Sequence, residues 1–209
     1  MKAKIASHLL KIKAVFLNPE EPFTWASGIK SPIYCDNRLI LGYPEIRKDI
    51  ETELANLIKK EFPGCQRLMG TATAGIPHAA YVSAILDLPM GYVRGKAKDH
   101  GRNNQIEGPL NPGDKVIVIE DLISTGGSSV ETVKALKEVG AEVLGLVSIF
   151  TYDFPRAAET FKAENVKALS LVDFKTLVEV AVKENYIKDA DYQKLLKFAA
   201  NPSDASWRD

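Results

Sequence analysis

Apolar residues in the first sixty positions recur at helical spacing in two stretches. The first runs from Ile5 to Phe16 and predicts an amphipathic helix over that stretch. The second begins at Pro44, a residue favoured at the first position of a helix, and predicts a helix that buries the apolar face of residues 46–58. Residues 23–38 mix aromatic residues, Gly, Pro and charge without a regular period, so short strands and a loop both remain open there.

From residue 67 onward, short apolar runs alternate with helical patterns. The runs are continuous in Val, Ile and Leu, as expected for strands whose two faces are both covered by helices. Strand and helix in alternation predict an open α/β fold with a parallel sheet. The predicted strands cover residues 67–70, 90–93, 116–119, 143–150 and 168–172, and the predicted helices cover residues 76–86, 128–139, 155–164, 173–184 and 190–199.

Neither an internal repeat nor a low-complexity tract divides the chain. We expect a single domain over residues 1–209, in which an N-terminal part of about residues 1–40 packs on an α/β core of about residues 44–200. Asp173 is the expected N-cap of the helix that follows it. The polar residues 201–209 are expected to fray.

Composition and charge exclude several classes of function. The 209 residues carry 27 Lys plus Arg against 27 Asp plus Glu, and a net charge of zero argues against a protein that coats nucleic acid. No apolar run approaches the roughly 20 residues that span a bilayer, and no secretory signal follows the basic start. Cys35 and Cys65 are too few for a disulfide framework, so we expect buried, reduced thiols in a cytoplasmic protein.

The most informative pattern combines a strand, a loop and the start of a helix between Val116 and Ser129. Glu120 and Asp121 close the apolar strand, at the end where ligands of open α/β sheets bind. Glycines allow backbone N–H groups to converge on an anion, and the N-terminal end of a helix adds positive potential. The loop therefore predicts a phosphate site, built from the residues that follow the acids: Ser124, Thr125, Gly126, Gly127, Ser128 and Ser129.

Glu120 and Asp121 suit a different part of the same ligand. Carboxylates are poor partners for phosphate, but they accept hydrogen bonds from vicinal sugar hydroxyls, directly or through hydrated Mg²⁺. A 5-phosphorylated ribose would satisfy the acids and the loop together. The plain alternative is a turn beside two solvated acids, but acids, hydroxyls and glycines in one unit favour a ligand site. The chain lacks GxxxxGK[ST] and GxGxxG, which argues against a P-loop or a dinucleotide site.

Two further stretches are candidates for anion binding. Residues 92–108 leave a predicted strand and carry alternating cationic residues: Arg94, Lys96, Lys98, His100 and Arg102. Such a loop can close over an anion and stabilise charge on a leaving group, although a solvated hairpin is the plain alternative. The small-residue turn at residues 70–77 can hold a diphosphate through its backbone amides, or it can simply allow close packing of a helix on a strand.

Together these stretches resemble the type I phosphoribosyltransferases. Residues 116–129 are similar to their motif for phosphoribosyl pyrophosphate (PRPP), in which an apolar strand and two acids precede a loop with T-G-G. Residues 92–101, which include K-D-H-G, resemble the catalytic loop of the orotate-using branch, and residues 23–34, with S-G-x-x-S-P, resemble its N-terminal hood. The resemblance implies a type I phosphoribosyltransferase fold: an open, mainly parallel sheet flanked by helices, with a small N-terminal hood.

The resemblance also implies a reaction. Orotate and PRPP would give orotidine 5′-monophosphate and diphosphate, in the synthesis of pyrimidines and UMP. Mg²⁺ would be the cofactor, carried by PRPP and assisted by Glu120 and Asp121 rather than held by dedicated protein ligands. The protein would be a homodimer that shares its catalytic loop across the interface. Neither nucleic acid nor membrane is an expected partner.

Residue roles follow from the same resemblance. The implied catalytic residues are Arg94, Lys98, His100 and Asp121. The residues implied to bind PRPP are Arg94, Lys98, His100, Glu120, Asp121, Leu122, Ile123, Ser124, Thr125, Gly126, Gly127 and Ser128. Ser124, Lys30 and Arg38 are the candidates for contact with orotate. The chain also departs from some members, which have a basic residue where Ala26 and Gly95 stand, and an Arg near Tyr152; Arg156 lies further on.

Two other functions are compatible with the PRPP motif. A phosphoribosyltransferase for purine bases would keep the motif but should lack the hood and the K-D-H-G loop. A regulator that senses PRPP without reacting should carry a module that binds nucleic acid, and the length and zero net charge leave no obvious room for one. The hood pattern and the loop cations therefore favour transfer to orotate.

Overall fold

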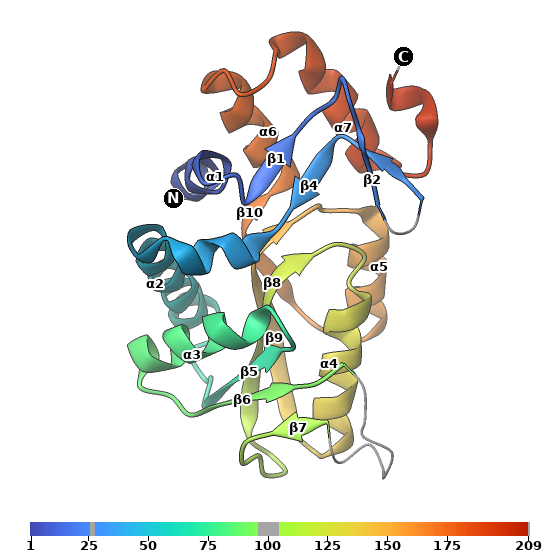
Figure 1. Cartoon of the computed structure of the whole chain (residues 1–209). Coiled ribbons are helices and arrows are strands. Elements are labelled where there is room, and N and C mark those ends of the chain that lie inside the picture. The colour runs from blue at the N-terminus through green and yellow to red at the C-terminus, as the bar shows by residue number, and fades with distance from the viewer. Residues whose placement is uncertain (26–27, 96–104, 209) are drawn as a thin grey trace.

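The structure, a computed structural model, describes residues 1–25, 28–95 and 105–208 (Figure 1). Its centre is a sheet with the strand order β10–β9–β8–β5–β6–β7. All neighbours in this sheet pair in parallel except β6 and β7, so the predicted open, mainly parallel sheet is confirmed. The strands are β5 (Arg67–Thr71), β6 (Met90–Val93), β7 (Ile106–Glu107), β8 (Lys115–Ile123), β9 (Glu142–Thr151) and β10 (Ala168–Asp173).

Helices cover both faces of this sheet, and Figure 1 shows them on either side of it. One face carries α2 (Pro44–Glu61) and α3 (Gly75–Leu86), with α1 (Lys2–Lys11) beside β10. The other face carries α4 (Gly127–Glu138) and α5 (Pro155–Ala163). Near the hood lie α6 (Phe174–Lys183), the short η3 (Asp189–Asp191) and α7 (Tyr192–Ala200). Because both faces are covered, β8 is fully buried from Val116 to Ile119, as its apolar run predicts.

The hood consists of short antiparallel pairs. Strand β1 (Val15–Leu17) pairs with β4 (Ile33–Cys35), and β2 (Phe23–Thr24) pairs with β3 (Lys30–Ser31). The 3-10 helix η1 (Asn37–Gly42) then leads into α2. The question that the sequence left open over residues 23–38 is therefore answered in favour of short strands.

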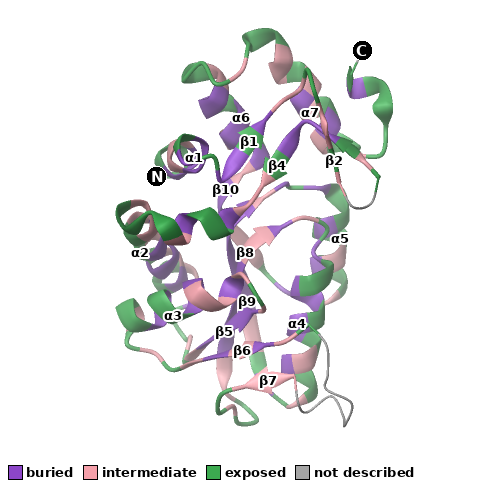
Figure 2. Ribbon diagram, viewed as in Figure 1, coloured by how far each residue is buried: buried purple, intermediate pink, exposed green. Residues whose placement is uncertain are grey.

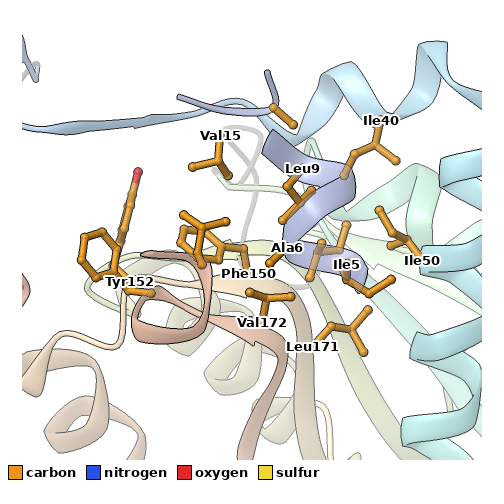
Figure 3. Packing of buried hydrophobic residues seen from close by; sticks show 14 of the residues in the cluster. Ile5, Ala6, Leu9, Val15, Ile40, Ile50, Phe150, Tyr152, Leu171 and Val172 are labelled. Carbon is orange, nitrogen blue, oxygen red and sulfur yellow. The ribbon is translucent and has the colours of Figure 1, made fainter. Parts of the chain in front are cut away.

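The hood and the sheet share one hydrophobic core. Figure 3 shows Ile5 and Leu9 of α1 together with Ile40 of η1, and Phe150 and Val172 of the sheet lie in the same cluster. Each fully buried aliphatic or aromatic side chain of this kind contributes roughly 1.5–3 kcal/mol to folding. A second cluster lies between the sheet and α4 and α5. Figure 2 accordingly shows buried residues along the central strands and exposed residues on the outer faces of the helices.

Two predictions about the ends of the chain are wrong. The first helix ends at Lys11 rather than at Phe16, because the chain turns at Lys13, whose φ is 56°, and Phe16 belongs to β1. The polar end does not fray as a whole. Residues 205–208 form the 3-10 helix η4 (Ala205–Arg208), and Trp207 is only 2% exposed, with its ring 5.6 Å from that of Phe198.

The other predicted helices and strands are present, with ends that differ by a few residues. Strand β8 runs four residues beyond its predicted end, to Ile123, and β7 was not predicted. Asp173 caps α6 as expected, because its carboxylate accepts a hydrogen bond from the Thr176 backbone N–H at 2.9 Å. None of the helices in the described part of the chain combines the length and apolarity needed to cross a membrane.

Candidate active site at the carboxyl edge of the sheet

The two predicted acids, Glu120 and Asp121, lie inside β8. They belong to the part of β8 that extends beyond its pairing with β5. The ladder between β5 and β8 ends at Ile119, whereas the ladder between β8 and β9 continues to Ile123. Glu120 and Asp121 therefore follow directly on the last residue that pairs with β5. This places them at the carboxyl edge of the sheet, where the fold class expects a ligand.

Glu120 is buried and hydrogen-bonded. It is 5% exposed; its Oε2 accepts from the Ser129 hydroxyl at 3.1 Å, and its Oε1 accepts from the Asp121 backbone N–H at 3.2 Å. Burial first, and then the neighbouring Asp121 carboxylate, raise the pKa of Glu120 to about 8. Ser129 thus faces the acid, and its expected place among the hydroxyls of the phosphate loop is wrong. Asp121 is half-buried and lies nearer the solvent.

The loop after β8 forms an open cradle in front of α4. Thr125, Gly127 and Ser128 are exposed, and Ser124 is half-buried. Gly126 has a φ of 80°, and a Cβ on it would lie 3.2 Å from the Phe161 ring of α5. Glycine is therefore required there both for the left-handed backbone and for the close approach of α5. Exposed hydroxyls and the positive end of α4 make this loop suited to an anion.

The small-residue turn between β5 and α3 packs against β8 beside the acids. A Cβ on Gly75 would lie 2.4 Å from the Ile119 carbonyl oxygen, so only glycine permits this approach. The expectation of close helix–strand packing is therefore confirmed at this position. Thr71, at the start of the turn, is 4% exposed, and its hydroxyl has no hydrogen-bond partner among the described residues. The role of the turn in binding diphosphate stays a prediction.

Arg94 directly follows β6, at the same edge of the sheet. Its backbone N–H donates to the Gln105 carbonyl at 2.8 Å, and its guanidinium forms an ion pair with Glu107 at 3.2 Å. The other cationic residues of this stretch lie outside the described residues: Lys96, Lys98, His100 and Arg102. Ala26, where some family members have a basic residue, also lies outside the described residues. The roles that the sequence suggests for Lys98 and His100 therefore stay predictions.

The two hood cations predicted for orotate both have partners within the hood. Lys30 Nζ donates to Thr24 Oγ1 at 2.6 Å. Arg38 binds Asp36 through Nε at 2.6 Å and through Nη2 at 2.8 Å, and its side chain is 67% exposed. Arg38 also holds the pKa of the Asp36 carboxyl below its usual value. The structure thus leaves their contact with orotate as a prediction.

Asn37 connects the hood to the acid pair, and the sequence analysis missed it. Its Nδ2 donates to the backbone carbonyl of Asp121 at 2.8 Å, and the residue is only 1% exposed. The neighbouring cation Arg38 drew attention because charge suggests anion binding. Asn37 lies beyond the hood pattern of residues 23–34 and carries no charge, so none of the patterns used to find candidate residues selected it.

An aromatic cluster closes the side of the site next to the hood. The ring centroid of Trp25 lies 5.3 Å from that of Tyr152 and 5.9 Å from that of Phe198, and its Nε1 donates to the Ile33 carbonyl at 3.2 Å. Trp25 also lines a cavity of about 280 Å³ together with residues of the phosphate loop, of α5 and of the C-terminal segment, among them Thr125, Arg156 and Asn201. Trp25 is therefore a packed aromatic residue that also faces a cavity beside the loop.

The remaining histidines and cysteines are structural in character. His78 Nδ1 lies 2.7 Å from Glu51 in a buried pair, and His8 Nε2 lies 2.9 Å from Asp49. Each of these histidines therefore has an acidic partner outside the candidate site. Cys35 and Cys65 are free thiols, as expected. Each is half-buried, so the expectation that both are buried is wrong. Burial raises the pKa of each thiol, so both are neutral at physiological pH.

Comparison with known proteins identifies the family and the fold. The family model for the phosphoribosyl transferase domain matches residues 42–185, which contain the acid pair and the phosphate loop. This chain is therefore a phosphoribosyltransferase, and the predicted type I fold is confirmed.

The relatives narrow the family further. The chain is 56% identical over 207 residues to the orotate phosphoribosyltransferase of Bacillus anthracis, covering 99% of each chain. It is equally identical over 202 residues to that of Listeria innocua, covering 97% of each. The solved orotate phosphoribosyltransferase of Aeropyrum pernix superposes with a TM-score of 0.76 at 28% identity, over 88% of this chain and 99% of that one. The chain belongs to the orotate phosphoribosyltransferases.

Proposed function

We propose that this chain transfers the 5-phosphoribosyl group of PRPP to orotate, which forms orotidine 5′-monophosphate and releases diphosphate. The observation that carries the proposal is the arrangement of β8 and α4. It places Glu120 and Asp121 directly beside an open phosphate cradle, Ser124 to Ser128, in a chain 56% identical to orotate phosphoribosyltransferases. The acids suit the ribose hydroxyls, and the cradle suits the 5′-phosphate.

The chemistry explains why both acids and cations are needed. The bond from the anomeric carbon to the diphosphate oxygen breaks, and a bond to a ring nitrogen of orotate forms. Positive charge therefore develops on the ribose and negative charge on the diphosphate. Asp121 and Glu120 lie on the ribose side, and Arg94, with Lys98 and His100 from the same stretch, answers the charge on the diphosphate. Orotate itself attacks, so no protein nucleophile is required, and the neutral cysteines have no role.

The acid pair also fits a magnesium ion that arrives with the substrate. Mg²⁺ prefers oxygen ligands and commonly combines one or two carboxylates with the phosphates of a substrate and with water. Asp121 offers carboxylate oxygens at this edge of the sheet, and the carboxyl group of Glu120 lies buried directly beside it. When bound, Mg²⁺ supplies compensation for the charge of the departing diphosphate. We assign Asp121, the more exposed acid, the larger share in this contact.

We further propose a single domain, made of hood and core, that acts as a homodimer in the cytoplasm. The resemblance implies that the catalytic loop of one subunit would act in the site of the other. Three large side chains on or beside α2 and α3 support a contact surface, because Tyr43, Tyr81 and Ile85 are each more than 40% exposed. The shortage of cysteine supports the cytoplasm.

The activity can be tested by ultraviolet absorbance of orotate. We expect orotate to be consumed only when PRPP and Mg²⁺ are both present, with each omitted in turn as the control. Absence of consumption, together with a PRPP-dependent rise in melting temperature, would contradict transfer to orotate. A purine base consumed in its place would establish a purine phosphoribosyltransferase, and binding without any turnover would establish a regulator.

A further inference from the structure

The junction between hood and core contains a buried amide that the proposed reaction does not use directly. Asn37 is the first residue of η1 and is 1% exposed. Its Nδ2 donates to the Asp121 backbone carbonyl at 2.8 Å, across 84 positions of sequence. Its Oδ1 is buried and has no hydrogen-bond partner among the described residues. A buried amide that satisfies only one of its two ends is unusual, because an unpaired polar atom disfavours folding.

The hydrogen bond between Asn37 and the Asp121 carbonyl lies where β8 has lost one of its two neighbouring strands. Strand β5 stops pairing with β8 at Ile119, so the segment that holds the two acids has β9 as its strand neighbour. A strand paired on both edges is held rigidly, whereas one paired on a single edge can tilt. The Asn37 amide supplies a backbone-like donor next to the place where the ladder with β5 ends. It thereby holds the peptide unit that follows the Asp121 Cα.

The two acids are consequently held by different parts of the molecule. Glu120 is held by Ser129 of α4 and by its neighbour's backbone, so its position depends on the core. Asp121 is tied through Asn37 to η1, which follows directly on the hood strand β4. Ile33 and Ile40, on either side of Asn37, are fully buried in the core shared by hood and sheet. Asn37 is thus anchored on both sides.

We propose that Asn37 is a positioning residue that sets the orientation of Asp121 toward the ribose of PRPP. This inference rests on the proposed function for the identity of the ligand. A catalytic carboxylate displaced by about 1 Å can lose a large part of its effect, up to about a hundredfold in rate. Loss of the Asn37 amide donor should therefore weaken PRPP binding and turnover without unfolding the chain.

Two variants remove the donor in different ways. Asn37→Leu replaces the amide with an apolar group of similar volume and also removes the unpaired Oδ1, so the two effects on stability oppose each other. Asn37→Asp keeps the shape and polarity but presents an acceptor to the Asp121 carbonyl. For both variants we expect the Kd and the KM for PRPP to rise about tenfold or more. Asn56→Leu, at an exposed position of α2, is the matched control and should change neither value.

A double variant separates positioning from a general structural effect. If Asn37 acts through Asp121, Asn37→Leu should have no further effect on PRPP affinity in an Asp121→Asn background. Melting curves of all variants complete the test, and we expect the Asn37→Leu chain to melt close to the wild type. Unchanged PRPP affinity in both Asn37 variants would overturn the inference. Full additivity with Asp121→Asn would overturn it as well.

Measurement of PRPP binding by calorimetry, alongside consumption of orotate, keeps the two proposals distinguishable. If the wild type consumes orotate and the Asn37 variants match it in both assays, the positioning role fails and the proposed function stands. If the wild type binds PRPP but consumes no orotate, the proposed function fails. Weaker PRPP binding in the Asn37 variants would still support the positioning role in that case.

Discussion

The PRPP end and the hood end of this site are assembled in different ways. The PRPP end lies on one continuous segment, in which β8, the phosphate loop and the start of α4 supply the acids and the cradle. The hood end collects Trp25 from the hood, Tyr152 and Phe154 from the segment after β9, and Phe198 from α7. These residues come from widely separated parts of the sequence, near its start and near its end.

The difference shows which features of a site are local. A phosphate cradle needs glycines, hydroxyls and a helix start in sequence, because consecutive backbone N–H groups form it. An aromatic wall needs only side chains of the right size, and any element that reaches the place can provide them. The first kind of site is recognisable in a sequence, whereas the second depends on tertiary packing.

The largest expected effect tests whether the continuous segment is sufficient at the PRPP end. Lys98 lies outside the described residues and is a catalytic candidate from the sequence pattern and the resemblance. Lys98→Ala should lower turnover by about a hundredfold or more, the scale of losing a charge partner of the transition state. Lys59→Ala, an exposed cation near the end of α2, is the control. Steady-state kinetics of both variants provide the test. If Lys98→Ala lowers turnover by less than severalfold, the residues of β8, the phosphate loop and α4 act without Lys98.

Prediction from sequence succeeded where one element decides its own structure. The apolar run from Val116 to Ile119 is buried on both faces as predicted, and the Gly126–Gly127 turn opens α4. The extension of β8 through Glu120 to Ile123 was missed, because polar residues there read as a loop. Their strand conformation comes from pairing with β9, which the segment itself does not encode.

Prediction failed where distant residues decide the outcome. Residues 201–209 follow α7 and are mostly polar, and this polarity predicts fraying. The ring of Trp207 nevertheless packs against Phe198 of α7 and is buried, and Lys194 of α7 donates a hydrogen bond to the Arg208 carbonyl, so this segment is ordered by contacts with α7. Asn37 was missed for the same reason, since its importance lies in the Asp121 carbonyl that it reaches.

The second prediction concerns Trp207→Ala, which removes a side chain that packs at the hood end of the site and leaves the residues of the PRPP end unchanged. Truncation of a large buried aromatic ring costs about 3–5 kcal/mol, which for a chain of this length lowers the melting temperature by roughly 6–20 °C. Because Phe198 also packs on Trp25, we expect the KM for orotate to rise more than the KM for PRPP. Arg208→Ala, at the exposed next position, serves as the control. An unchanged melting temperature would show that the C-terminal segment is not packed in solution.

The effect that is smallest at each step of pH concerns the proton on Glu120, the acid held by the core. Burial keeps its pKa in the folded chain near 8, whereas the unfolded chain titrates near the ordinary value of about 4.5. Between these values the folded chain binds the extra proton, so the free energy of unfolding falls as pH rises through this window and is level above it.

Glu120→Gln removes this titration. The melting temperature of the variant, relative to that of the wild type, should therefore increase as pH rises from 5 to 8. One pH unit corresponds to about 1.4 kcal/mol, or a few degrees for a chain of this length. Ser129→Ala removes a hydrogen bond that favours the ionised form of Glu120. The melting temperature of this variant should therefore continue to fall up to a higher pH than that of the wild type. Melting curves at several pH values provide the test. Parallel curves for the wild type and Glu120→Gln would mean that Glu120 is already ionised at neutral pH, and that both acids face the ribose as carboxylates.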